Sequence, residues 1–127
     1  MITESLVSKS SQKLQAVLDD LQHQPYVETA VLGTTDGLPV SPQVPEVSHL
    51  AAVAGFLLAA AKQSSSMLGR RGCEEVVIQL SAEAILICHP FMSGEMELIL
   101  TILLQRNTAY KRLAAQTIHA IEEVLAA

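Results

Sequence analysis

Aromatic residues, cysteines and positive charge are all scarce in this sequence. Its 127 residues include no Trp, two Tyr, two Phe and two Cys, and eight Lys and Arg stand against thirteen Asp and Glu. The resulting net charge of −5 opposes binding to a phosphate backbone. The lack of aromatic rings also removes the stacking platforms that bind single-stranded nucleic acid. We therefore expect no nucleic-acid partner and a core of aliphatic side chains.

Segments that would direct the chain to a membrane are also missing. The N-terminal stretch MITESLVSKSSQKLQ is polar and lacks the apolar region of a signal peptide. The most apolar run, LAAVAGFLLAAA at residues 50–61, is shorter than the roughly 20 residues that span a bilayer. The length fits one domain over residues 1–127, with a core at about 10–126. We expect a cytoplasmic protein.

No group of residues forms a recognisable metal, cofactor or catalytic site. The two cysteines, Cys73 and Cys88, lack CxxC spacing and are predicted to be small buried apolar residues in a reducing compartment. Cys88 and His89 are adjacent in a predicted strand, so their side chains point to opposite faces and cannot form a dyad. No histidine stands at metal-ligand spacing from another ligand type, which holds for His23, His49, His89 and His119. We expect no catalysis, no metal and no cofactor.

The segment GTTDG at residues 33–37 has the small-residue composition of a phosphate-binding loop. However, no lysine follows it, and the next segment contains prolines rather than opening a helix. Asp-Gly tolerates the positive φ angles of tight turns, so the segment predicts a hairpin turn. This turn would join a strand at residues 27–35 to a second strand at residues 38–44, which Pro39 and Pro42 confine to a sheet edge.

Three helices and three further strands complete the predicted order α-β-β-α-β-β-β-α. The first helix runs from Ser10 or Ser11 to Gln24, the second from an N-cap at Ser48 to about Leu68, and the third follows an N-cap at Asn107. The strands EEVVIQLS, EAILICHP and EMELILTILLQ lie between the last two helices. The last two strands are apolar on both faces, so both must be covered. The pattern predicts an α/β (α+β) domain of three layers, with the middle helix facing the other two.

The second predicted helix is apolar around its whole circumference. Such a helix must be buried on more than one side, and a chain of this length offers no further layer to cover it. Ala52, Gly55, Ala59 and Ser66 are small enough to let a second helix approach. The strand EEVVIQLS has no proline or lysine to protect its edge. Both features indicate a symmetric dimer. The alternative is that alanine simply favours helix and that the outer face stays in water.

With this order of elements, the sequence resembles the Roadblock family of dynein light chains and bacterial GTPase regulators. The signature lies in VETAVLGTTDGLPVS, and the alanine-rich helix, the hairpin of residues 76–89 and the apolar strand of residues 98–104 extend the resemblance over residues 10–126. The matched signature positions are Val27, Ala30, Val31, Leu32, Asp36, Gly37, Leu38 and Val40. The resemblance implies a five-stranded antiparallel sheet of order 2-1-5-4-3, with the first and third helices on one face and the second on the other.

The resemblance also implies a homodimer in which the third strands pair across a twofold axis and the second helices pack together. We expect the dimer contacts at Val53, Gly55, Phe56, Ala59 and Ala60 of the helix and at Val76, Val77, Ile78, Gln79 and Leu80 of the strand. The apolar helix surface ends in polar side chains, which we expect either to contact a partner or merely to keep the surface soluble. These are Lys62, Gln63, Arg70 and Arg71.

Three functions remain open from the sequence. Members of the family commonly bind and regulate small Ras-like GTPases and are not enzymes themselves, so the leading hypothesis is a homodimeric regulatory or scaffold module for such a GTPase. The alternative is a structural adaptor, similar to a dynein light chain, that assembles a complex without nucleotide dependence. The third is a small-ligand sensor of profilin- or PAS-like build, which requires a cavity with polar groups and ranks last.

Overall fold

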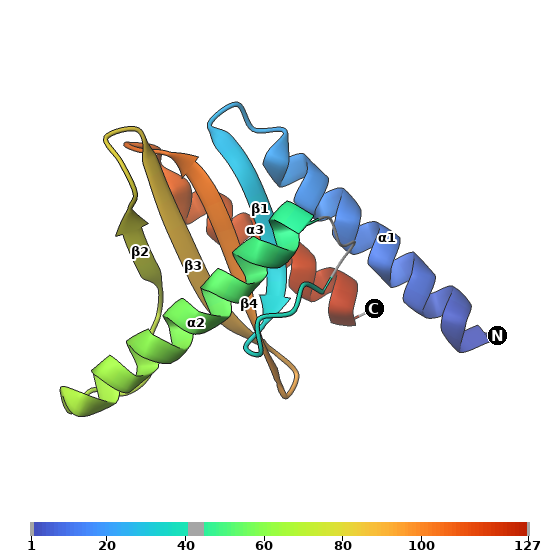
Figure 1. Cartoon of the computed structure of the whole chain (residues 1–127). Helices are drawn as coiled ribbons and strands as arrows, with labels where there is room; N and C mark the ends of the chain where they lie inside the picture. The colour runs from blue at the N-terminus through green and yellow to red at the C-terminus, as the bar shows by residue number, and fades with distance from the viewer. Residues whose placement is uncertain (1, 41–44, 127) are drawn as a thin grey trace.

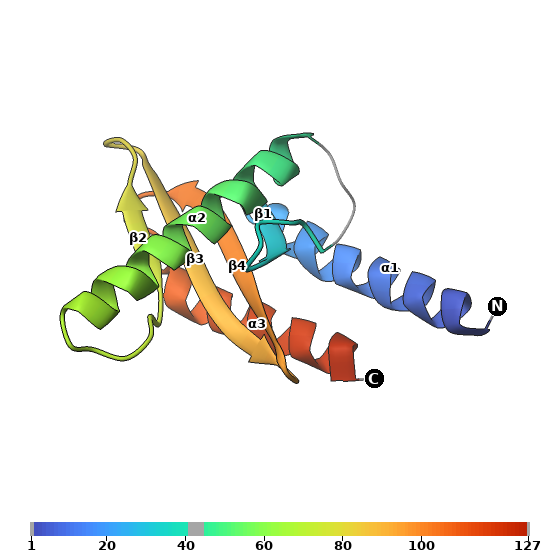
Figure 2. The same ribbon diagram turned by 60° about the horizontal axis from the view of Figure 1, so that its bottom comes forward.

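An antiparallel sheet forms the middle layer of the molecule, with one helix on one face and two on the other (Figures 1 and 2). The computed structural model describes the backbone of residues 2–40 and 45–126 and the side chains of residues 11–40 and 47–126. Its elements are α1 (Ile2–Gln22), β1 (Val27–Thr34), α2 (Pro45–Met67), β2 (Val76–Gln79), β3 (Ala84–Ser93), β4 (Met96–Gln105) and α3 (Tyr110–Ala126).

The described sheet has four strands in the order β1-β4-β3-β2, so the predicted five-stranded order 2-1-5-4-3 is wrong in its first position, whereas the other four strands keep their predicted neighbours. The missing element is the predicted edge strand at residues 38–44. There, Pro39 forms a single bridge to Gly33, and residues 41–44 lie outside the described part. The turn occupies the residues before Leu38, and the described segment ends at Val40, whose N–H donates to the Leu32 carbonyl oxygen at 2.8 Å. The described part of the segment therefore leaves room for one bridge only, and the predicted element order loses its second strand.

Two apolar clusters hold the helices to the sheet. The larger lies between the sheet and the pair α1 and α3, where Leu18 and Ile121 meet Leu100 and Ile102. The smaller lies on the opposite face, where Ala54 and Leu58 of α2 meet residues of β3 and β4. Both faces of β3 and β4 are thus covered, as their apolar alternation predicts.

The starts of the helices differ from those predicted. Helix α1 begins well before Ser10, and α2 begins at Pro45 rather than after Ser48. Proline suits the first turn of a helix because no intrahelical partner exists for an N–H there. Asn107 has a φ of 69° and lies before the start of α3, so it forms part of a turn and is not the N-cap. Asparagine tolerates this left-handed conformation better than most residues.

A hydroxyl group is buried without a partner at the centre of the sheet. Thr101 is fully buried, and its Oγ1 has no hydrogen-bond partner among the described residues. Its cross-strand neighbour is Cys88, but the contact does not meet hydrogen-bond geometry. Burial raises the pKa of the Cys88 thiol, although the Thr101 hydroxyl partly offsets this rise. The site is therefore one where an apolar side chain fits better than a polar one.

We expect Thr101→Val to raise the free energy of unfolding by about 1 kcal/mol, because an unpaired buried hydroxyl costs that much or more. The matched control is Thr117→Val. Thr117 is also buried, but its hydroxyl donates to the Leu113 carbonyl oxygen at 2.8 Å, so its removal should bring no gain. Urea unfolding of both variants measures the difference. Equal effects at the two sites would show that the Thr101 hydroxyl does not destabilise the fold.

Candidate functional site

Helix α2 is apolar on two opposite faces. Its inner face packs on the sheet and is buried through Ala51, Ala54 and Leu58. Its outer face is uncovered, and Phe56 is 73% exposed there, with Val53 at 45%. We define the α2 outer face as the exposed residues Ala52, Val53, Phe56, Ala59, Ala60, Gln63 and Met67. Contiguous exposed apolar side chains of this kind are typical of an interaction surface.

Strand β2 presents an open edge beside this helix. It pairs with β3 and with no other strand of the described sheet. Val77 is 43% exposed and Leu80, just after the strand, is 53% exposed. The N–H and C=O groups on the unpaired side form a template for another strand. The C-terminal half of α2 passes beside β2, so the open edge and the α2 outer face are close together (Figure 1).

The structure places the predicted dimer residues unequally. Val53, Phe56, Ala59 and Ala60 all lie exposed on the α2 outer face, while Val76 and Ile78 pack partly buried beneath α2. Val77, Gln79 and Leu80 are exposed. Gly55 differs from the other predicted dimer residues of the helix because it is buried within the chain.

Gly55 faces the turn of residues 35–37. A Cβ atom on Gly55 would lie 3.0 Å from both the Cα and the N of Gly37 and 3.2 Å from the carbonyl oxygen of Thr35. Gly37 itself has a φ of 84°, which fits the tight turn predicted for Asp-Gly. The absence of a side chain at Gly55 therefore lets the turn press against α2. The small-residue pattern of the sequence links Gly55 only to a second helix and gives no sign of this contact with the turn.

The predicted partner residues also separate into two groups. Lys62 forms an ion pair with Glu97 of β4, so it ties α2 to the sheet. Gln63, Arg70 and Arg71 are exposed, and neither arginine has an ion-pair partner in the described part of the chain. Met67 and Leu68 beside them are 80% and 77% exposed. The end of α2 and the following loop thus combine cationic and apolar groups.

The neighbouring residues Cys88 and His89 lie on opposite faces of the sheet. Cys88 packs beneath α2, whereas His89 lies on the opposite face near α3, as strand alternation predicts. Among the described residues, no three His, Cys, Asp or Glu side chains lie close enough together to hold a metal ion. The described helices also include none with the length and hydropathy to span a bilayer.

Comparison with known proteins gives a family match and a shared fold. The sequence model of the Roadblock/LC7 domain family matches residues 13–104 of the chain. A Roadblock/LC7 domain from Streptomyces avermitilis is similar at a TM-score of 0.69 and 23% identity, over 85% of this chain and 91% of that one. The gliding protein MglB from Thermus thermophilus gives a TM-score of 0.72 and 17% identity, over 92% and 91% of the two chains. Myxococcus xanthus MglB gives a TM-score of 0.66 and 18% identity, over 91% of this chain and 86% of that one. No curated protein matches the sequence.

Proposed function

Because the chain belongs to the Roadblock/LC7 domain family, we propose that it is a homodimeric regulatory and scaffold module that binds a small Ras-like GTPase. The observation that carries this proposal is the α2 outer face, which leaves Phe56 and its apolar neighbours uncovered in a single chain. The open edge of β2 supports it, because it provides a second surface for the same dimer.

The two surfaces fit one symmetric arrangement. Antiparallel pairing of two β2 strands joins the two sheets into one, because each strand offers its free edge to the other. A twofold axis perpendicular to the sheet keeps the same face of both copies on the same side. Both α2 helices then lie side by side on that face, and the flank of each outer face that turns toward the twofold axis packs against the other. Burial of the exposed Phe56 ring would supply a central apolar contact.

The GTPase would bind at the polar ends of the paired helices. Arg70 and Arg71 are exposed and unpaired within the described residues, so they are available to acidic side chains of a partner. Met67 and Leu68 add apolar area next to them. A module that acts by repositioning the catalytic residues of the GTPase would require no nucleophile or metal of its own.

We expect the wild-type chain, immobilised, to capture a Ras-like GTPase from lysate of its host in a manner that depends on added GTP analogue or GDP. The variant Arg70→Glu/Arg71→Glu should reduce the captured amount at least tenfold, because it replaces attraction by repulsion. Arg112→Glu, at an exposed position of α3, is the control and should leave capture unchanged. Mass spectrometry identifies the captured protein.

The second candidate function is an adaptor that assembles a complex without a nucleotide. The open β2 edge favours this adaptor, because such an edge also accepts an extended segment of a partner. Capture that is equal with GTP analogue and GDP, or capture of proteins other than a GTPase, would contradict the regulator and favour the adaptor.

A further inference from the structure

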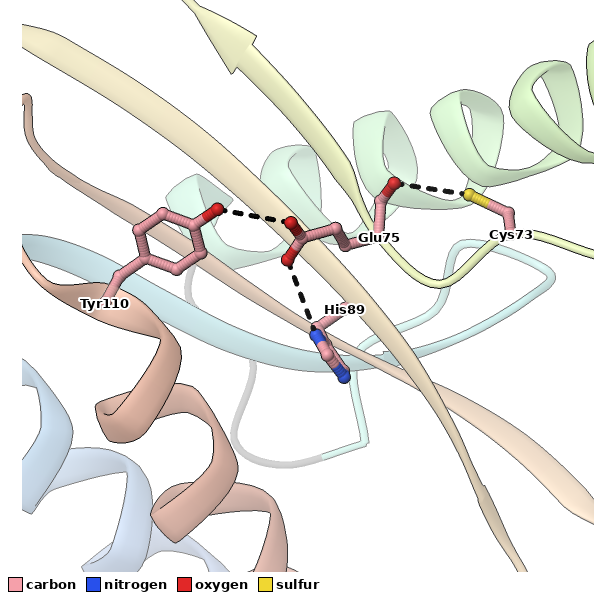
Figure 3. Close-up of polar contacts among 4 residues, drawn as sticks. All are labelled: Cys73, Glu75, His89 and Tyr110. Atoms are coloured by element: carbon pink, nitrogen blue, oxygen red, sulfur yellow. Dashed lines mark hydrogen bonds and ion pairs between the residues drawn. The ribbon is translucent and has the colours of Figure 1, made fainter.

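Glu75, the residue just before β2, contacts three separate parts of the chain (Figure 3). The Tyr110 hydroxyl at the start of α3 donates a hydrogen bond to Glu75 Oε1 at 3.2 Å. The Nδ1 atom of His89 on β3 lies 3.9 Å from Glu75 Oε2. The thiol of Cys73 donates to the backbone carbonyl oxygen of Glu75 at 3.4 Å. Glu75 therefore connects the loop after α2 with β3 and α3.

The sheet register explains why these groups meet. Val76 stands opposite Cys88 in the β2–β3 ladder, so Glu75 stands opposite His89, one step beyond the end of the strand. Alternation places Glu75 on the α3 side of the sheet, while Val76 and Ile78 pack on the α2 side. The next residues of β2 on the α3 side, Val77 and Gln79, are exposed. Among the described residues, the Glu75 carboxylate is thus the group that links this side of β2 to α3.

A strand as short as β2 needs such a contact. It has four residues and one paired edge. A slip of one residue against β3 would send every side chain of the strand to the opposite face. The slip would also carry the Glu75 carboxylate away from the Tyr110 hydroxyl. Burial and the neighbouring Glu75 both raise the pKa of Tyr110, so the phenol stays protonated as a donor at neutral pH.

We propose that Glu75, Tyr110 and His89 form a polar clamp that fixes the start and register of β2 and thereby positions the strand edge that pairs with a second copy of the chain. The second half of this inference rests on the proposed homodimer, whereas the first half holds for a single chain. The three are positioning residues, because they act on the interface through β2 and do not line its open edge.

The test compares four variants: Glu75→Ala, Glu75→Gln, Tyr110→Phe and the control Glu74→Ala. Glu74 is the exposed neighbouring carboxylate and has no hydrogen bond or ion pair among the described residues. Amide hydrogen exchange of β2 is measured in the Phe56→Asp background, where dimerisation should not protect the strand. Sedimentation equilibrium gives the dimer dissociation constant of each variant without that substitution.

We expect Glu75→Ala and Tyr110→Phe to accelerate β2 exchange at least tenfold, with β4 unchanged, and to raise the dimer dissociation constant at least tenfold. Glu75→Gln should retain much of the slow β2 exchange and of the tight dimerisation, because its amide oxygen still accepts a hydrogen bond from Tyr110. Glu74→Ala should match the wild type in both measurements. A Glu75→Ala variant whose β2 amides exchange at the wild-type rate would overturn the clamp. Faster exchange with an unchanged dissociation constant would overturn its link to the interface. Faster exchange in a chain whose wild type does not dimerise would instead contradict the proposed homodimer and leave the clamp intact.

Discussion

The variant Phe56→Asp is expected to raise the dimer dissociation constant at least 100-fold, or about 3 kcal/mol. The ring is 73% exposed in the single chain, so the substitution removes little internal packing. In the proposed dimer, however, it would place two unpaired carboxylates near the twofold axis between apolar helices. Each would lose its hydration without gaining a partner. Sedimentation equilibrium measures the dissociation constant, and circular dichroism confirms the fold of the monomer.

The matched control for this experiment is Met92→Asp. Met92 is a large apolar residue that is 54% exposed near the end of β3, opposite Glu97 of β4 and outside both the α2 outer face and β2. The Met92→Asp variant should dimerise with the same dissociation constant as the wild type. A Phe56→Asp chain that dimerises as tightly as Met92→Asp would show that the α2 outer face does not carry the dimer.

The variant Gly55→Ala is expected to lower the free energy of unfolding by about 2 kcal/mol. In an ordinary helix interior the same change stabilises by about 1 kcal/mol, because alanine has the higher helix propensity. Here the new Cβ would lie 3.0 Å from the backbone of Gly37, which cannot rotate away as a flexible side chain could. Either α2 or the turn of residues 35–37 must shift, and packing is lost. The sign of the effect is therefore the opposite of the usual one.

Urea unfolding of Gly55→Ala checks this result. Ser66→Ala serves as the control, because it raises helix propensity at an exposed position of the same helix and should stabilise by a few tenths of a kcal/mol. A gain in stability for Gly55→Ala would mean that the turn does not pack on α2 as closely as the structure places it.

Apolar periodicity predicts the layers of this fold. Each helix or strand must carry apolar side chains on the faces that it buries, so the pattern can be read within the element itself. The stripe of Leu14, Leu18 and Leu21 identifies α1, and the two-sided apolar pattern of β4 predicts a sheet covered on both faces. The all-round apolar pattern of α2 also predicts a face that the single chain leaves open, and the exposed Phe56 ring lies on that face. The sequence alone does not decide between Pro45 and Ser48 at the start of α2, because proline suits the first helical turn and serine suits the N-cap.

Contacts between distant residues could not be predicted in the same way. The ion pair of Lys62 with Glu97 depends on how α2 crosses the sheet, which no local pattern determines. The contact of Gly55 with the turn of residues 35–37 depends on the same crossing. Glu75 and His89 are a partial exception, because the hairpin register alone places them opposite each other once the turn between β2 and β3 is known. The role of Tyr110 follows only from the position of α3.

The measurement that tests the central claim most directly is an isotope-filtered NOE experiment on an equal mixture of labelled and unlabelled chain. It detects contacts between copies and excludes those within one copy. The account predicts NOEs from the Phe56 ring protons of one copy to the α2 methyl groups of the other, notably those of Val53 and Ala59. A dimer that gives no NOE from Phe56, or a chain that remains monomeric at the millimolar concentration used for such spectra, would contradict it.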